Sequence, residues 1–539
     1  MSTVTLRQAL SVLGRSSPFA VSTLSDEKST DLLDQLKSYL FIEQEIEGDF
    51  VAALKAVKFG DVIFLCGSSG DGKSEILTRH YDEFRDTVYF HLDATHSFAP
   101  QQSGTQALDV LFDKRASDNK PLAIGVNIGM LANYGKEGAD RHADVKAAID
   151  RFLGQQAPPA NFVFLDFEQY PKFNFTIDAE TYSVFAKRLM QRLTADSAEN
   201  PFRRLASQDQ QSGTDLKLVA NFALLGRQSV QETIIDNLFK TRLAKDQFIT
   251  TRALLDLLHH LLVGDQYLAD SLFCGGDSEL AQRLSDFDPA SKRTQKLDQF
   301  VLRYELDLPD VELDEFLIQL STQHLVYSRT PSNPGSAGSL IRLFYLLRNE
   351  SIANNYHHQF SDEFSDELLE RYAKVWLLHD QFSGEEREKT NLRQFYVNEL
   401  ISAVFNYANR NAPKLKKGEL FLGQFGDIEL ATPVELKGDY ASISRNRATR
   451  SSHFFAYLKI LDVSLSPIAI NLSLFELIYK LNRGYRPNKY DKSAVVLLDE
   501  IIEQVTEVAK LNSRLKFYGM DSSYTLSHDD EMITVSEAY

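Results

Sequence analysis

The chain contains 539 residues, which is too long for one ordinary hydrophobic core, so we expect two to four domains. Hydrophobic residues make up 43% and charged residues 25% of the sequence, which is average globular usage and excludes a disordered or fibrous protein. The formal net charge of −17 argues against a broad basic surface for DNA. A local basic stripe, or a partner subunit that carries positive charge, is compatible with it.

Cysteines and histidines form no metal-binding pattern. The two cysteines, Cys66 and Cys274, are far apart and fit neither a disulfide framework nor a C-x-x-C site. The histidine pairs 259–260 and 357–358 are adjacent and lack the i, i+4 spacing of helical metal ligands. We therefore expect a reducing, cytoplasmic location. The sequence has neither a signal-peptide core nor a run of about 18 apolar residues, so we expect no membrane segment.

The first third of the chain alternates between strand-like and helix-like segments. Apolar residues at helical spacing over residues 32–57 predict one or two helices. Short apolar runs predict buried parallel strands at 61–66, 87–92, 121–127 and 162–167. Helix-like segments lie between them at 74–84, 105–114 and 140–153. This alternation predicts a doubly wound α/β domain with a mostly parallel sheet.

The pattern becomes helical after about residue 178, with clear 3.6-residue periodicity at 251–263 and 366–378. A turn-rich stretch at 330–339 predicts a surface loop or a boundary. Strand-like runs at 419–425 and 453–463 and a helix at 494–511 then predict an α+β module. The expected domains are a helical lead-in, an α/β core, a helical lid or interaction region and this module, at 1–50, 51–177, 178–412 and 413–539.

Residues 67–74 match the phosphate-binding pattern G-x-x-x-x-G-K-[ST], directly after a predicted strand and at the start of a predicted helix. Glycines let backbone N–H groups turn inward around an anion, and the helix N-terminus adds positive potential. Lys73 is placed to reach the β- and γ-phosphates, and Ser74 to offer its hydroxyl to Mg²⁺. The alternative is a strand-to-helix turn with an incidental lysine.

We therefore predict an AAA-like P-loop NTPase fold for residues 51–177, with ATP and Mg²⁺ as cofactors. The predicted nucleotide-binding residues are Gly67, Ser68, Ser69, Gly70, Asp71, Gly72, Lys73 and Ser74. Lys73 is also the first predicted catalytic residue.

Hydrolysis needs a carboxylate that holds Mg²⁺ or its water, and often a second one that polarises the attacking water. Asp166 lies at the carboxyl end of the strand at 162–167 and Glu168 lies two residues further on, and they are the candidates for these two roles. The acid usually ends an earlier strand, but the strand at 121–127 ends in Asn127. Either Asp166 has taken the role or the chain hydrolyses poorly, and the alternative for both acids is a solvated strand end. Asp93 is a third candidate, with a capping or turn residue as the alternative.

Arg252 opens a predicted helix after two threonines and is a candidate to reach a γ-phosphate from a helical lid, as second-sensor arginines do. A guanidinium at a helix start is unfavourable for the helix dipole, which points to another purpose. The alternative is an ordinary surface arginine.

Basic residues lie beside aromatic ones at two places in the C-terminal module, residues 445–455 and 483–490. Such clusters suit phosphate contact combined with ring stacking, and the alternative is charged, solvated loops. A third basic run lacks aromatic neighbours and consists of Lys414, Lys416 and Lys417.

The chain resembles the DptF (DndF) subunit of bacterial phosphorothioation-dependent DNA restriction systems. The phrases that carry the resemblance are HLDATHS at 91–97, IGVNIGMLANY at 124–134, FITTRALLDLLHHLLVG at 248–264 and the opening at 7–24, together with the phosphate-binding pattern. The resemblance implies a cytosolic anti-phage defence protein that works with subunits resembling DptG and DptH on DNA without sulfur-modified backbones. The family's nucleotide role carries over to residues 67–74 alone.

Two functions remain open at this point. In the first, the chain is an ATPase subunit of a restriction complex, oligomeric or part of a hetero-complex, with DNA contacted through the complex. In the second, bound nucleotide serves as a structural ligand or switch, and the chain is a scaffold with little hydrolysis of its own. A small-molecule kinase is disfavoured by the large helical and α+β additions.

Overall fold

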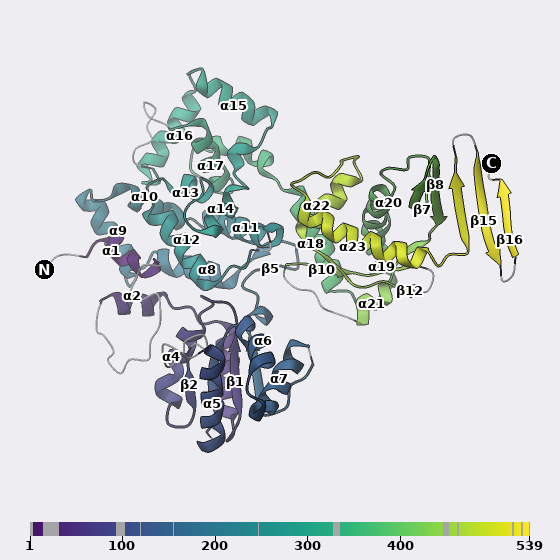
Figure 1. Ribbon diagram of the computed structural model, residues 1–539. Helices are drawn as coiled ribbons and strands as arrows, with labels where there is room; N and C mark the ends of the chain where they lie inside the picture. Colours follow the sequence, from purple (N-terminus) through teal and green to yellow (C-terminus); the bar gives the residue numbers. More distant parts are fainter. Residues whose placement is uncertain are drawn as a thin grey trace. The chain divides into compact units, whose positions relative to one another are not determined.

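The structure, a computed structural model, describes residues 4–14, 32–92, 103–118, 120–154, 156–245, 247–326, 335–445, 452–460, 463–519, 522–529 and 532–537. The chain divides into two compact units (Figure 1). Unit 1 comprises Met1–Phe173, Ser183–Leu238 and Phe248–Ser365. Unit 2 comprises Asn174–Tyr182, Phe239–Gln247 and Asp366–Tyr539. Each unit is therefore assembled from segments that are distant in sequence.

Unit 1 contains a four-stranded sheet in which every pair of neighbouring strands is parallel. Its strand order is β2-β3-β1-β4. The strands are β1 (Val62–Cys66), β2 (Tyr89–His91), β3 (Leu122–Val126) and β4 (Phe162–Asp166). All residues of the inner strands β1 and β3 are buried, as expected for a parallel sheet covered on both faces.

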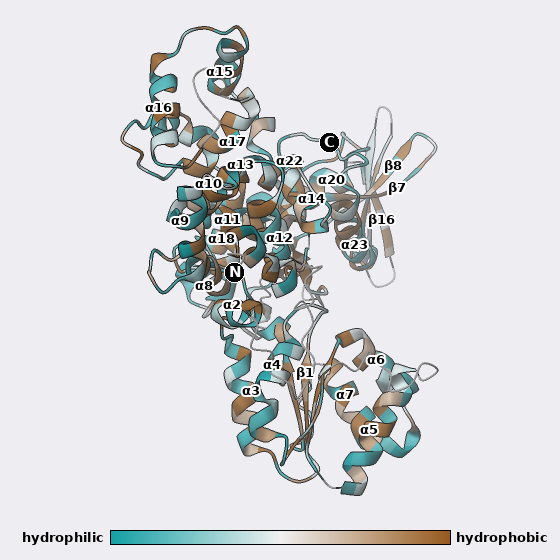
Figure 2. Cartoon of the chain, turned by 90° about the vertical axis from the view of Figure 1, so that its left-hand side faces the viewer, coloured by the Kyte–Doolittle hydropathy of each residue, from teal (hydrophilic) through white to brown (hydrophobic). Residues whose placement is uncertain are grey.

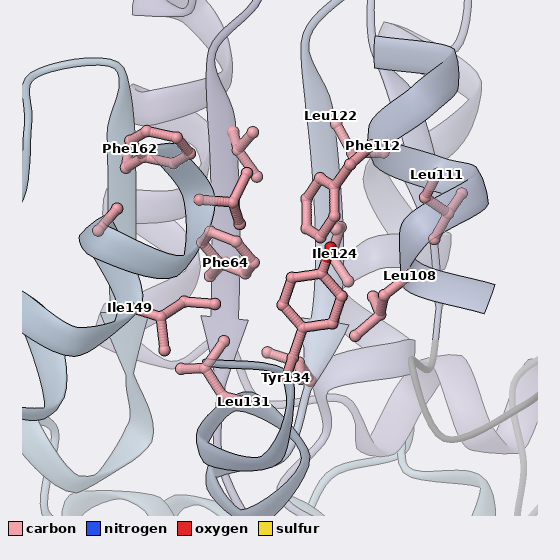
Figure 3. Close-up of a cluster of buried hydrophobic side chains, with 14 of the residues drawn as sticks. Phe64, Leu108, Leu111, Phe112, Leu122, Ile124, Leu131, Tyr134, Ile149 and Phe162 are labelled. Atoms are coloured by element: carbon pink, nitrogen blue, oxygen red, sulfur yellow. The ribbon is translucent and has the colours of Figure 1, made fainter. Parts of the chain in front are cut away.

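Side chains of β1 alternate between two hydrophobic cores, one on each face of the sheet. Val62, Phe64 and Cys66 belong to the core shown in Figure 3, whereas Ile63 and Leu65 belong to the other. Figure 2 shows α3 and α4 on one side of the sheet and α5, α6 and α7 on the other. These helices are α3 (Glu45–Ala56), α4 (Lys73–Phe84), α5 (Gly104–Asp118), α6 (Ile128–Glu137) and α7 (Ala143–Leu153).

The structure confirms a parallel α/β domain combined with a large helical region. Helix α6 was missed by the sequence prediction, because Gly129 and Gly135 lower the helix propensity of its segment. The side chain of Asn127 nonetheless caps α6, accepting a hydrogen bond from the Met130 N–H at 2.6 Å. The four ranges proposed as domains stay a prediction.

Helices dominate the remainder of unit 1. Short segments at its N-terminal side are α1 (Leu6–Leu10) and α2 (Leu32–Leu40). The helices that follow the sheet are α8 (Val184–Thr194), α9 (Pro201–Ser212), α10 (Leu216–Leu225), α11 (Gln228–Lys245), α12 (Thr251–Val263), α13 (Leu268–Phe273), α14 (Glu279–Ser285), α15 (Gln295–Glu305), α16 (Val311–Thr322) and α17 (Ala337–Leu347). Helix α11 belongs to unit 1 as far as Leu238. Residues 330–334, half of the turn-rich stretch at 330–339, lie outside the described residues, and residues 337–339 begin α17.

Unit 2 combines helices with small antiparallel sheets. Its helices are α18 (Glu367–Asp380), α19 (Glu386–Arg393), α20 (Ser402–Ala408), α21 (Tyr440–Arg445), α22 (Leu472–Leu481) and α23 (Lys492–Ala509), with a π-helix at Gln394–Ile401. Short strands are β5 (Asn174–Phe175), β6 (Thr181–Tyr182), β9 (Leu436–Gly438), β10 (Phe454–Ala456), β11 (Leu458–Ile460), β12 (Val463–Ser464) and β13 (Ile468–Ile470). A five-stranded sheet consists of β7 (Glu419–Phe425), β8 (Ile428–Pro433), β14 (Arg514–Tyr518), β15 (Ser523–Asp529) and β16 (Met532–Glu537). None of the helices in the described ranges is long and apolar enough to cross a membrane.

A buried histidine lies in the aromatic core of unit 2. Nδ1 of His379 lies 2.8 Å from the Val375 carbonyl oxygen and Nε2 lies 3.2 Å from the Tyr396 hydroxyl, so a neutral ring satisfies both contacts. Its ring stacks on Phe454 with a centroid distance of 4.3 Å. Burial lowers the pKa of His379 from 6.5 to about 4.

This depressed pKa predicts a loss of stability in mild acid. The unfolded chain binds a proton at His379 near pH 6.5 and the folded chain near pH 4, so stability is lost as the pH falls through this window, by about 2 kcal/mol at pH 5. Trp376, the single tryptophan, is buried in the same helix, so its fluorescence during urea unfolding measures the effect in unit 2. His379→Gln should weaken the pH dependence, whereas replacing the exposed His528 should leave it unchanged. A wild-type unfolding midpoint that is equal at pH 7 and pH 5 would contradict the prediction.

Candidate functional site

The segment that matches the phosphate-binding pattern joins the buried strand β1 to helix α4. Gly70 and Gly72 have φ angles of +86° and +105°, in the left-handed region that favours glycine. A Cβ atom at Gly67 would lie 2.9 Å from both Asp71 Oδ2 and Phe167 Cδ2. Three glycines of the pattern are therefore required by the backbone path and by the close packing around it.

Lys73 and Ser74 occupy the first turn of α4. The Lys73 ammonium donates hydrogen bonds to the carbonyl oxygens of Gly67 and Ser68, at 3.1 and 2.8 Å, and its residue is 8% exposed. The Ser74 hydroxyl donates a long hydrogen bond of 3.4 Å to the Leu92 carbonyl oxygen. The loop is thus closed around its own lysine, and the partly positive N-terminus of α4 adjoins it.

A buried ion pair between Asp71 and Lys172 stabilises the loop. Asp71 is fully buried; its Oδ2 accepts the Ser68 N–H at 2.7 Å and its Oδ1 lies 3.0 Å from Lys172 Nζ. Lys172 is itself 8% exposed and its ammonium lies 5.2 Å from the centroid of the Phe167 ring. The sequence pattern treats Asp71 as a variable position, and no local signal identifies Lys172 as its partner.

Strand pairing brings Asp166 next to the loop. Parallel β1 and β4 are in a register that sets Asp166 opposite Cys66, the residue that precedes Gly67. The Asp166 carboxyl accepts the Glu168 N–H at 3.1 Å, and Asp166 is 9% exposed. Burial, and then the nearby Asp166 charge, raise the pKa of the Cys66 thiol, so this cysteine stays protonated. Glu168 is exposed, one residue into a short 3-10 helix.

The other flanking strand, β3, is followed directly by Asn127. Its side chain is engaged as the cap of α6. Of the two strands beside β1, β4 ends in the carboxylate Asp166, whereas β3 ends in Val126, and both of these residues pair with Cys66. Asp93 lies outside the described residues.

The N-terminus of α12 contacts the loop through its backbone and a hydroxyl. The Arg252 N–H donates to the Gly70 carbonyl oxygen at 2.9 Å, and Thr251 Oγ1 donates to the Asp71 carbonyl oxygen at 3.1 Å. A Cβ atom at Gly70 would lie 2.7 Å from Arg252 Cβ, so the two segments pack closely. Thr251 was not among the predicted site residues.

The Arg252 guanidinium is hydrogen-bonded to residues outside the loop. It donates to Asp256 Oδ1 at 2.7 Å and to the Leu13 carbonyl oxygen. Its Nε is buried and has no hydrogen-bond partner among the described residues. Contact of this guanidinium with a phosphate would require release from Asp256.

The basic clusters lie in unit 2 and are only partly described. Residues 446–451 lie outside the described ranges. In the second cluster, Arg483 stacks on Tyr479 with 3.3 Å between Cζ and the ring centroid, and Lys489 lies 5.0 Å from the Tyr490 ring centroid. Tyr490 is 83% exposed, and Lys414 donates to the Gly519 carbonyl oxygen. DNA contact by these residues stays a prediction.

In the described part of the chain, no group of three or more His, Cys, Asp or Glu side chains is arranged to hold a metal ion. Comparison with protein-family models, curated proteins and solved structures finds no match for this chain. The chemistry of the loop and its neighbours therefore carries the functional proposal.

Proposed function

We propose that residues 67–74 bind ATP with Mg²⁺ and that the chain is the ATPase subunit of a phosphorothioation-dependent DNA restriction complex. One observation carries the nucleotide part of this proposal: a glycine-containing turn with a helix-starting lysine lies directly beside a strand that ends in a carboxylate. Phosphate oxygens, Mg²⁺ and an attacking water need this combination of groups at one edge of a parallel sheet.

Each residue then has a distinct role. Lys73 exchanges the carbonyl oxygens of Gly67 and Ser68 for phosphate oxygens, which are stronger acceptors because they are charged. Ser74 and Asp166 hold Mg²⁺, and Glu168 orients the attacking water. Bound Mg·ATP supplies the electrophilic γ-phosphorus.

The contacts of the loop explain how nucleotide would influence the helical region. The carbonyl oxygens of Gly70 and Asp71 accept hydrogen bonds from Arg252 and Thr251, respectively, the first two residues of α12. A shift of the loop on nucleotide binding therefore reaches α12 directly, and Arg252 gains access to the γ-phosphate only when it leaves Asp256. This connection fits a nucleotide-dependent change in partner or DNA contacts.

The biological setting is proposed from the family resemblance. It consists of a cytoplasmic anti-phage complex with subunits resembling DptG and DptH, in which DNA is contacted through the complex. The basic and aromatic residues of unit 2 are compatible with such contacts, since stacked Arg483 and exposed Tyr490 suit phosphates and bases.

A nucleotide-bound scaffold is the second candidate. The observation that favours it is the end of β3, where Asn127 takes the usual position of the acid and is occupied with capping α6. The net charge of −17 also favours protein contacts over DNA contacts. In this case Asp166 serves Mg²⁺ binding and turnover is negligible.

Asp166→Asn separates the two candidates. For an ATPase we expect steady-state turnover, with duplex DNA and partner subunits present, to fall about 30-fold, because the neutral amide is a weaker Mg²⁺ ligand. Asp86→Asn changes an exposed carboxylate beyond the opposite end of α4 and should leave turnover unchanged. Wild-type protein that binds ATP but never turns it over would establish the scaffold, and wild-type protein without ATP affinity would overturn both.

A further inference from the structure

The five-stranded antiparallel sheet of unit 2, in the order β16-β15-β14-β8-β7, has one face that is rich in apolar side chains. Directly paired residues of neighbouring strands point to the same face. Leu515 of β14 is opposite Leu526 of β15, which is opposite Val535 of β16. Ile533, two residues from Val535, continues this face along the edge strand.

The same face continues across the inner strands. Phe517 of β14 is opposite Tyr524 of β15 on one side and Leu430 of β8 on the other. Ile428, two residues from Leu430, is opposite Phe425 of β7. Nine apolar or aromatic side chains from five strands therefore share one surface, which we call the apolar sheet face. His528 and Glu537, its polar neighbours on the hairpin, stand at opposite ends of β15 and β16.

Much of the apolar sheet face is open to solvent. Phe425 is 72% exposed, Ile533 66% and Val535 62%, while Ile428 and Tyr524 are more than 40% exposed. Contiguous apolar patches of this kind are uncommon on monomeric soluble proteins and mark interaction sites. The exposed hairpin also leaves β16 as an edge strand with all six residues exposed.

The opposite face of the hairpin is mostly polar, with Met532 as its one apolar side chain among the paired residues of β15 and β16. Thr525 and Ser527 of β15 are opposite Ser536 and Thr534 of β16. All six residues of β16 are exposed, so solvent contact alone does not separate the two faces. The exposed apolar side chains of the hairpin therefore gather mainly on one face, with the two-residue period of a strand.

We propose that the apolar sheet face packs against the same face of a second copy of this chain. Five strands about 4.8 Å apart and about 20 Å long give a surface of roughly 500 Å² in plan. Because side chains project from the sheet, the accessible area of the face is larger than this plan area. It approaches the roughly 800 Å² that each partner buries in a standard stable interface. Two such sheets pack face to face about 10 Å apart, as the layers of a β-sandwich do.

Charge identifies a second copy as the occupant. None of the nine side chains is charged, and the one carboxylate on this face, Glu537, is exposed at the end of β16, so two copies of the face can meet without burying an unpaired ion. A nucleic acid or an anionic membrane would need cations at the contact, which these nine side chains lack. The surface that best complements this face is another uncharged sheet with the same twist. A symmetric dimer provides such a surface, because both partners contribute the same face.

The test uses the full-length chain in sedimentation velocity, without nucleotide, so it is independent of the proposed ATP site. We expect a dimer at about 10 µM and, for Val535→Lys or Ile533→Lys, a dissociation constant raised at least about 100-fold, because each dimer then buries two new charges. The matched controls Thr534→Lys and Ser536→Lys introduce the same charge on the same exposed strand but on the opposite face, and should dimerise like the wild type.

Two further measurements complete the test. The Trp376 unfolding midpoint should be equal in all four variants at a concentration where the wild type is monomeric, since these side chains are exposed. Raising NaCl from about 50 to about 500 mM should preserve or strengthen the dimer, because screening weakens repulsion between two chains of charge −17. A wild-type monomer at about 100 µM, or a dimer weakened equally by all four substitutions, would overturn the proposal.

Discussion

Lys73→Ala should lower the affinity for Mg·ATP by at least about 100-fold and abolish restriction of unmodified plasmid DNA. The ammonium makes two charge-assisted hydrogen bonds to loop carbonyl oxygens and is nearly buried, and alanine removes both the bonds and the charge. Loss of two such bonds to phosphate corresponds to about 3 kcal/mol, or about two orders of magnitude in affinity. Isothermal titration with a non-hydrolysable ATP analogue measures the affinity directly.

A second lysine of the same α/β domain provides the control. Lys146 Nζ also donates to a loop carbonyl, that of Gly138 at 3.0 Å, and pairs with Asp140. Lys146→Ala removes the same kind of contact away from the candidate site and should leave ATP affinity and restriction unchanged. Equal affinity of Lys73→Ala and wild-type protein would exclude nucleotide binding at residues 67–74. If Lys73→Ala loses ATP affinity as expected but still restricts plasmid DNA like the wild type, ATP binding is not needed for the proposed biological role.

Gly125→Ala should destabilise the α/β domain by about 3 kcal/mol, although it adds a single methyl group. Gly125 is buried in β3, and a Cβ atom there would collide with the carbonyl oxygen of Leu92 and lie 2.9 Å from Leu77 Cδ1. The Leu92 carbonyl oxygen belongs to the backbone, so it cannot move aside by a side-chain rotation. The same Leu92 oxygen accepts the Ser74 hydroxyl hydrogen bond, so the substitution should also lower ATP affinity.

Hydrogen exchange is the suitable measurement for Gly125→Ala, because a chain with two compact units need not unfold in one step. We expect faster exchange at the amides of β2 and β3, with unchanged Trp376 fluorescence in unit 2. Gly129→Ala, four residues further along the chain, is the control. A Cβ atom there meets only Asn127 Oδ1, at 3.5 Å, within a helix that alanine favours. Equal protection in both variants would show that the sheet relaxes around the added methyl group.

The loop is tied to two parts of unit 1 that are far from it in sequence. Asp71 pairs with Lys172, which follows β4, and its carbonyl oxygen accepts the hydroxyl of Thr251 at the start of α12. These contacts hold the loop in one arrangement. If the loop binds nucleotide as proposed, these contacts connect the bound nucleotide to the segment after β4 and to α12.

Local patterns in the sequence were sufficient for the parallel α/β domain and for the candidate loop. A run of apolar residues such as those of β1 identifies a strand covered on both faces, because both neighbouring layers exclude water. The spacing of Gly67, Gly72 and Lys73 identifies a tight turn before a helix, since positive φ angles and close packing restrict those positions to glycine. These requirements act over a few residues and can therefore be recognised without the fold.

Tertiary structure decided which distant residues stand beside the loop. Asp166 lies later in the chain than the acid that usually holds Mg²⁺ in such a site. It nonetheless stands opposite Cys66, because β4 pairs with β1 on the side opposite β3. The partnership of Asp71 with Lys172 spans 101 positions, and the apolar sheet face is assembled from five strands. Strand order and register depend on the packing of whole layers, so no local pattern specifies them.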